Sequence, residues 1–92
     1  GKSISYRVVV PEGSNMFEIA QFLEAAKLCA ASEFLKLVRD PVFVQSQLGE
    51  PASSLEGYLF PDTYLFTKVD TVKIMAREMV RRFQERFKEV PP

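Results

Sequence analysis

Two carboxylates, Glu56 and Asp62, lie in an apolar stretch, residues 55–66, that otherwise consists mostly of Leu, Phe and Tyr. A carboxyl group kept among such side chains loses hydration. This loss penalises the charged form and favours the proton that a general acid must carry at neutral pH. Composition alone also fits a second interpretation, in which Glu56 is a solvated residue at a strand start and Asp62 belongs to an ordinary Pro-Asp turn.

The residues around Glu56 restrict the backbone. Gly57 allows either an unusual turn or the close approach of a ligand. Pro61 fixes its own φ and lacks an N–H donor, so no central strand is expected to run straight through it. Asp62 and Thr63 are expected to fix the turn after Pro61, and through it to support Glu56.

The remaining composition excludes several other kinds of chemistry. The 92 residues include no His, which excludes Ser-His and Cys-His catalysis and removes the commonest metal ligand. The one Cys, Cys29, cannot form an internal disulfide and supplies too little for a zinc site, so we predict a buried, inert thiol. Twelve basic residues balance twelve acidic ones, which argues against nucleic acid or anionic lipid as a partner.

Ten adjacent residues, 55–64, read Leu-Glu-Gly-Tyr-Leu-Phe-Pro-Asp-Thr-Tyr (the signature segment). This run resembles the signature of the endolytic murein transglycosylases, the MltG or YceG-like family, some members of which carry the label aminodeoxychorismate lyase. In that family the Glu of the Glu-Gly pair is the catalytic acid, and the resemblance places this role on Glu56. The resemblance covers essentially the whole chain, and it implies only the first part of a longer enzyme.

The resemblance implies a lytic transglycosylase that cleaves MurNAc-GlcNAc linkages within peptidoglycan glycan strands. One Glu protonates the glycosidic oxygen. As a carboxylate it then accepts the proton of the MurNAc C6 hydroxyl, which attacks C1 and leaves a 1,6-anhydro end. Because the nucleophile belongs to the substrate, one carboxyl suffices and neither metal nor cofactor is implied. A glycoside hydrolase would need two carboxyls about 5–9.5 Å apart, whereas Glu56 and Asp62 are roughly 20 Å apart in an extended strand.

Two other functions stay open. In one, the chain is a non-catalytic peptidoglycan-binding module in which Glu56 only hydrogen-bonds a sugar. The weaker one is a PLP-type lyase, as the older label suggests, but no Gly-rich phosphate loop is present. Tyr58 and Tyr64 are candidates for sugar contact, and the alternative for both is a place in the core.

The elements that would position these residues predict an α+β fold. Alternating apolar residues indicate a first strand over 4–10. Residues 64–67, or else 58–60, are expected to pair with it. The order resembles a small LysM-like β-α-α-β module, assigned to residues 1–50. Residues 51–92 would then be the truncated N-terminal part of a catalytic domain, a strand and turn segment followed by a long C-terminal helix.

Local signals place three helices between the strands. Asn15 and Glu18 form a capping-box pair for the first. Ser32 is predicted to cap the second. Asp40, followed by proline, opens a short third helix that ends at Gly49.

Asp70 and Thr71 are predicted to cap a last helix that runs to about Lys88. Apolar side chains recur along it at steps of three or four residues. They are Val72, Met75, Met79, Phe83 and Phe87. The opposite face carries ion pairs such as Glu78 with Arg82. So wide an apolar face predicts either burial against a further part of the protein or self-association through this helix.

No apolar run reaches the roughly twenty residues needed to span a bilayer, and no signal peptide is present. The resembling family has an N-terminal membrane helix. The resemblance therefore implies a protein of the bacterial inner (cytoplasmic) membrane, anchored by a single pass outside this chain, with its catalytic part facing the periplasm or cell wall. Glycan strands and peptidoglycan synthases are the implied partners. We expect the 92-residue chain alone to be inactive or nearly so.

Overall fold

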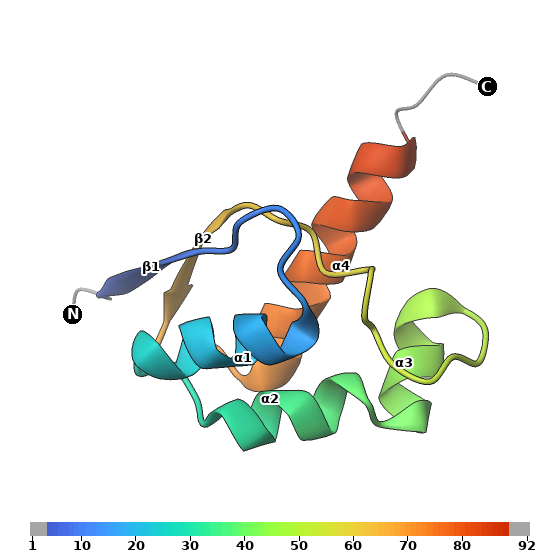
Figure 1. Ribbon diagram of the computed structural model, residues 1–92, viewed down its shortest axis with the longest axis horizontal. Helices are drawn as coiled ribbons and strands as arrows, with labels where there is room; N and C mark the ends of the chain where they lie inside the picture. Colours follow the sequence, from blue (N-terminus) through green and yellow to red (C-terminus); the bar gives the residue numbers. More distant parts are fainter. Residues whose placement is uncertain (1–3, 89–92) are drawn as a thin grey trace.

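Two strands and four helices make up the fold in a computed structural model of the chain, which describes residues 4–88 (Figure 1). In chain order they are β1 (Ser5–Val9), α1 (Met16–Ala25), α2 (Ala31–Val38), α3 (Pro41–Leu48), β2 (Thr63–Thr67) and α4 (Val72–Lys88). The strands form one small sheet and the helices pack beside it, which confirms the predicted α+β class.

The sheet pairs the first strand of the chain with a strand more than fifty residues later. β1 and β2 pair antiparallel, with Val8 opposite Tyr64. The partner strand predicted at 64–67 is therefore confirmed, and the alternative at 58–60 is wrong because the chain turns there. The resulting order has three helices between the two strands, as the sequence predicts.

Two helices begin where local signals place them. At α1, Asn15 Oδ1 accepts from the Glu18 N–H at 2.8 Å, and Glu18 Oε1 accepts from the Asn15 N–H at 2.9 Å, so the capping box is confirmed. At α3, Asp40 Oδ1 accepts from the Val42 N–H at 2.9 Å. That helix ends at Gly49, whose φ of 80° is in the left-handed region, as expected for a helix stop.

The predicted cap of α2 is wrong. The helix starts at Ala31, one residue before Ser32, and its N-cap residue Ala30 makes no side-chain hydrogen bond. The acceptor comes from the preceding helix, because Glu24 Oε2 accepts from the Ala31 N–H at 3.0 Å. A negative side chain at this position also stabilises the positive end of the helix dipole. Local sequence cannot show an acceptor that lies on another helix.

Of the two residues predicted to cap α4, Asp70 and Thr71, only Thr71 accepts a hydrogen bond from the helix. Thr71 Oγ1 accepts from the Ile74 N–H at 3.2 Å and so caps α4. Asp70 Oδ2 accepts instead from the Thr67 N–H at 2.8 Å, where β2 ends. The pair thus fixes both the end of the strand and the start of the helix.

One hydrophobic cluster holds residues 4–88 together. From the first half it includes Val8, Val10, Ile19, Leu23, Phe34 and Val38, and from the second Leu55, Leu59, Tyr64, Phe66, Met75 and Met79. The domain boundary predicted after residue 50 does not coincide with a break in this core. That residues 51–92 belong to a separate catalytic domain stays a prediction.

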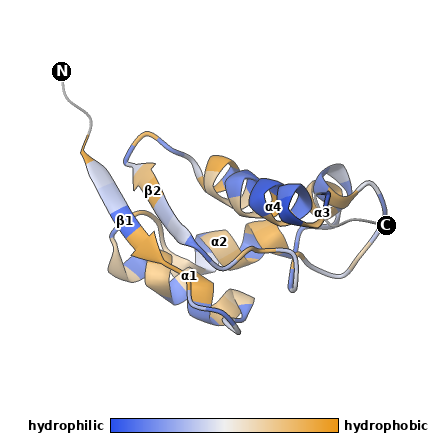
Figure 2. Ribbon diagram, turned by 90° about the horizontal axis from the view of Figure 1, so that it is seen from above, coloured by the Kyte–Doolittle hydropathy of each residue, from blue (hydrophilic) through white to orange (hydrophobic). Residues whose placement is uncertain are grey.

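The C-terminal half of α4 extends beyond the body formed by the other elements (Figure 1). The predicted pair of Glu78 with Arg82 is present, with 2.8 Å between Oε2 and Nε. In Figure 2 the middle turns of this helix present mostly hydrophilic residues to the viewer. Phe87, however, is 59% exposed, so the covering surface or self-association expected for this helix stays a prediction. Within residues 4–88, no helix has the length and apolar character needed to cross a bilayer.

Candidate functional site

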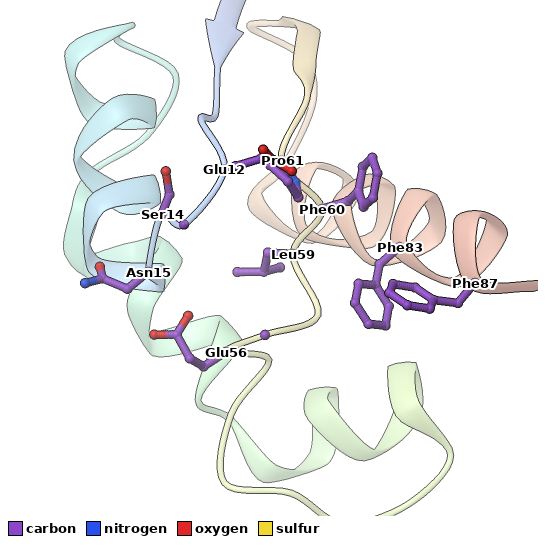
Figure 3. A pocket seen from close by; sticks show the side chains of 11 residues that line it. Glu12, Ser14, Asn15, Glu56, Leu59, Phe60, Pro61, Phe83 and Phe87 are labelled. Atoms are coloured by element: carbon purple, nitrogen blue, oxygen red, sulfur yellow. The ribbon is translucent and has the colours of Figure 1, made fainter. Parts of the chain in front are cut away.

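Three segments that are distant in sequence enclose a groove of about 510 Å³ (Figure 3). The turn between β1 and α1 supplies residues 12–15, and the signature segment supplies Glu56, Gly57 and residues 59–61. The third side comes from Phe83 and Phe87 on α4. Glu56 therefore lies on a concave surface, as expected for a residue that contacts a ligand.

The N-terminus of α1 holds the Glu56 side chain. Oε2 accepts from the Met16 N–H, the first residue of the helix, at 2.9 Å. The Glu56 N–H donates in turn to Ser54 Oγ at 3.1 Å. Figure 3 shows the carboxyl group pointing toward Asn15, across the groove from the two phenylalanines. Within residues 4–88, Oε1 has no hydrogen-bond partner.

The dehydration expected for Glu56 is wrong for this chain, because the residue is exposed. Its apolar neighbours are buried instead: Leu55 is 0% exposed, and Leu59, which also borders the groove, is 7% exposed. A turn separates the two environments, with the Tyr58 N–H donating to the Leu55 carbonyl at 2.9 Å. Apolar residues adjacent in sequence thus bury themselves and leave the carboxylate in solvent.

Gly57 makes this turn possible. Its φ is +88°, a conformation that residues with a side chain rarely adopt. A Cβ added there would meet nothing within 4 Å. Of the two explanations open for this glycine, the unusual backbone turn is therefore the one that residues 4–88 support.

Tyr64 is buried in the core and leaves no exposed surface for a sugar, which argues against its predicted substrate-binding role. It is 0% exposed and stacks on Phe66, with ring centroids 5.5 Å apart. Its hydroxyl donates to the Phe60 carbonyl. Burial raises the pKa of this phenol well above its usual range, with the charge of Arg82 acting in the opposite direction. The alternative of a core position is the correct one.

Tyr58 is half-buried, and its possible contact with a sugar stays a prediction. Its ring packs edge-on against Phe83, with 5.3 Å between centroids. Phe83 in turn lies 4.5 Å from Phe87, centroid to centroid. On α4 these two phenylalanines form the aromatic wall of the groove, and Tyr58 packs against Phe83 without belonging to the lining.

The comparisons with known proteins agree with the fold and with the signature segment. The model of the YceG-like family matches residues 1–91. The chain belongs to the YceG-like family. A yceG-like protein of Listeria monocytogenes, known from a crystal structure, is 27% identical and superposes with a TM-score of 0.77. The match covers 88% of this chain and 32% of that protein, so this chain spans about a third of its length. No curated protein matches.

Asp62 lies apart from the groove of this YceG-like chain. As predicted, it fixes the local turn, since Oδ1 accepts from the Thr63 N–H at 2.8 Å. Its Oδ2 pairs with Arg82 Nη1 at 2.9 Å, beside a second hollow of about 360 Å³. The Asp62 side chain is directed to α4, and its support of Glu56 through this turn stays a prediction. Pro61 does line the groove.

The groove of the YceG-like chain includes residues that the sequence interpretation missed. Glu12 lies in the turn after β1. It lines the same groove as Pro61, Leu59 and Glu56 (Figure 3). The sequence places Phe83 and Phe87 on the apolar face of the last helix, for which it predicts burial against a further part of the protein or self-association. A helix longer than the body it packs on was the signal that its last turns would stay uncovered.

The structure of the YceG-like chain also bears on metal binding and on Cys29. In the part of the chain that the structure describes, no three His, Cys, Asp or Glu side chains are grouped so as to hold a metal ion. Cys29 is half-buried, and burial followed by the charges of Glu33 and Glu24 raises its pKa to about 11. Such a thiol keeps its proton at neutral pH, in agreement with an inert cysteine.

Proposed function

We propose that this chain is part of a peptidoglycan lytic transglycosylase in which Glu56 acts first as general acid and then as base. The proposal rests on the resemblance of the signature segment and on one observation: the Glu56 carboxyl is anchored by a single oxygen at the edge of an aromatic groove. Oε2 is held by the Met16 N–H, while Oε1 is available for proton exchange.

The proposed reaction needs only this carboxyl from the enzyme. Glu56 donates its proton to the oxygen between MurNAc and GlcNAc as that bond breaks. It then removes the proton from the MurNAc C6 hydroxyl, whose oxygen forms the new bond to C1. The product is a 1,6-anhydro ring, and the carboxyl returns to its protonated state. The nucleophile is tethered to the reacting carbon, which supplies the advantage of proximity.

The lining of the groove suits a glycan strand better than a phosphorylated cofactor. Leu59, Phe60, Pro61, Phe83 and Phe87 give it apolar and aromatic surface, on which the faces of sugar rings can pack. Among residues 4–88, no lysine belongs to this lining. A PLP-type lyase would need one for its Schiff base, so the groove gives that function no support.

Exposure of Glu56 bears on where activity can occur. A general acid at neutral pH needs water excluded around its carboxyl, and the groove leaves that carboxyl exposed. We propose that bound glycan, together with further parts of a longer protein, excludes the water. On this basis the 92-residue chain alone is expected to be nearly inactive.

The exposure also favours the second function, a module that binds peptidoglycan without cleaving it. In that case Glu56 would accept hydrogen bonds from sugar hydroxyls or N-acetyl groups, and the same aromatic wall would hold the strand. The two functions differ in the products left after incubation with the cell wall.

The experiment is a digest of purified sacculi by the full-length protein that carries this chain, with mass spectrometry of the released glycan. We expect 1,6-anhydro ends. Glu56→Gln should abolish them without unfolding the protein, because the amide oxygen can still accept from the Met16 N–H. Glu33→Gln, the same change on the exposed side of α2, is the matched control and should keep the activity. Reducing ends would indicate hydrolysis, and binding without cleavage would favour the module.

The proposal includes a location and partners. A single membrane-spanning segment outside this chain would anchor the protein in the inner membrane, with the groove facing the periplasm or cell wall. There it would act on glycan strands beside peptidoglycan synthases. Protease accessibility of the groove-bearing part in spheroplasts, compared with intact cells, tests this orientation.

A further inference from the structure

We infer that the first turn of α1 is the device that positions Glu56 for its reaction. The inference rests on the proposed function of Glu56 and adds a positioning residue to it. The contact that carries it is the hydrogen bond from the Met16 N–H to Glu56 Oε2 at 2.9 Å, which joins residues 40 positions apart in the sequence.

The capping box makes this N–H available to Glu56. Helices leave their first N–H groups without partners inside the helix. In α1, Asn15 Oδ1 takes the Glu18 N–H, and Glu18 Oε1 takes the Asn15 N–H. Both local acceptors are thereby used, and the Met16 N–H takes its acceptor from the signature segment.

The start of α1 is itself held in place. The Met16 side chain is buried in the core. Just before it, Ser14 donates from its hydroxyl to the Pro11 carbonyl at 2.7 Å, and the Val10 N–H donates to the Asp62 carbonyl at 2.9 Å. The donor is therefore fixed relative to the sheet, and an acceptor bound to it is fixed as well.

Fixing Oε2 matters because a free glutamate side chain rotates about three bonds. Proton transfer needs the carboxyl within hydrogen-bond reach of the glycosidic oxygen and then of the C6 hydroxyl. With Oε2 bound, the plane of the carboxyl is restricted and Oε1 is the oxygen left to exchange the proton. The other role for this contact is purely structural, in which Glu56 only stabilises the helix start.

One substitution removes the donor and keeps the helix. Met16→Pro deletes the N–H at the first helical position, where proline is favoured. The preceding residue, Asn15, has an extended backbone with φ −89° and ψ 172°, which is compatible with a following proline. Met16→Ala is the matched variant, because it loses the same buried side chain and retains the N–H.

The test measures kcat and KM of the full-length protein on uncrosslinked glycan strands. Met16→Pro is expected to have a kcat at least about tenfold below that of Met16→Ala, the order of effect for one lost hydrogen bond to a charged group. The KM values should agree, because the contact orients Glu56 and does not bind sugar. Equal kcat values for the two variants would overturn the inference.

A second pair keeps the test decisive if Met16→Pro does not fold. Asn15→Ala removes the side-chain cap and loosens the first turn, whereas Asn15→Ser retains an acceptor for it. The same difference in kcat is expected between these two variants, and equal values would contradict the inference.

Glu56→Gln in the same assay separates the two levels of the proposal. If that variant still produces 1,6-anhydro ends, the proposed function falls, and the positioning role falls with it. If the ends disappear while Met16→Pro equals Met16→Ala, only the positioning role falls.

Discussion

Tyr64 shows that strand register decides whether an aromatic side chain can meet a ligand. It lies opposite Val8, and both point into the core, whereas the next residue, Leu65, is 64% exposed. Its hydroxyl satisfies the Phe60 carbonyl of the preceding turn. The tyrosine at the end of the signature segment thus lies in the core and holds the backbone of Phe60, which lines the groove.

We expect Tyr64→Phe to lower the free energy of unfolding by about 1–2 kcal/mol, because it leaves the Phe60 carbonyl without its donor. The KM for glycan strands should not change. Chemical denaturation gives the first quantity and steady-state kinetics the second. A raised KM with unchanged stability would restore the sugar-binding role that the structure removes.

The sequence could single out Glu56 as a candidate site residue, but it could not predict whether its carboxyl is exposed to solvent. Its type and its neighbours single it out, and the resemblance assigns it a role. Whether it is dry depends on the turn at Gly57, which sends Leu55 and Leu59 inward and the carboxyl outward. Adjacency in sequence says little about hydration once the backbone takes a φ of +88°.

The helices show which structural signals are local. The capping box of Asn15 with Glu18 and the stop at Gly49 involve residues a few positions apart, and the sequence predicts both. The start of α2 depends on Glu24, which belongs to the preceding helix. The groove likewise depends on residues that are distant in sequence, because its aromatic wall belongs to α4 and its carboxylate to the signature segment.

A pair of substitutions at the start of α2 tests this correction. Glu24→Ala should reduce the free energy of unfolding by about 1 kcal/mol, the usual cost of losing a cap. Ser32→Ala should change it little, because Ser32 makes no capping bond. Denaturant titrations of both variants give the comparison, and the reverse order would mean that the local signal is correct after all.

On α4, an ion-pair network makes stability depend on pH. Hydrogen bonds from Arg81 and then Arg82 lower the pKa of Glu78 from its ordinary 4.5 to about 2, although its partial burial acts in the opposite direction. Because the folded pKa is the lower one, this contribution is present above pH 4.5 and is lost as the pH falls toward 2.

We therefore expect Glu78→Gln to weaken the loss of stability between about pH 5 and about pH 3. Glu85→Gln is the control, since its carboxylate, which meets Arg81 at 3.1 Å, is 59% exposed and should contribute little. The measurement is the free energy of unfolding against pH for the three proteins. A Glu78→Gln curve parallel to that of the unaltered protein would exclude this network as the cause.

Over the whole molecule, both halves of the sequence build one core. β1 has its partner in β2, and α2 packs against α4. A β-α-α-β unit needs a second strand beside the first. Because that strand is β2, a module of residues 1–50 would be incomplete. The fold class, the element order and the partner strand could be predicted, because each follows from periodicity and caps. That both halves of the sequence share one core could not be predicted in this way.

A truncated chain that ends after residue 50 tests whether the first half needs the second half for its core. We expect it to be unfolded, because Val8 loses its partner Tyr64 and the core loses all the residues that the second half supplies. Circular dichroism and amide-proton dispersion in NMR spectra are the measurements, with the 92-residue chain as the folded control. A cooperative thermal transition of the shorter chain would show that the first half is an independent unit.

The central claim is that Glu56 transfers a proton within the sugar chain and that no water enters the product. Digestion of sacculi by the full-length protein in isotopically labelled water, with heavy oxygen, tests this most directly by mass spectrometry of the new glycan ends. The account predicts anhydro ends that carry no label and that vanish in Glu56→Gln. Labelled reducing ends, or unlabelled anhydro ends that persist in Glu56→Gln, would contradict it.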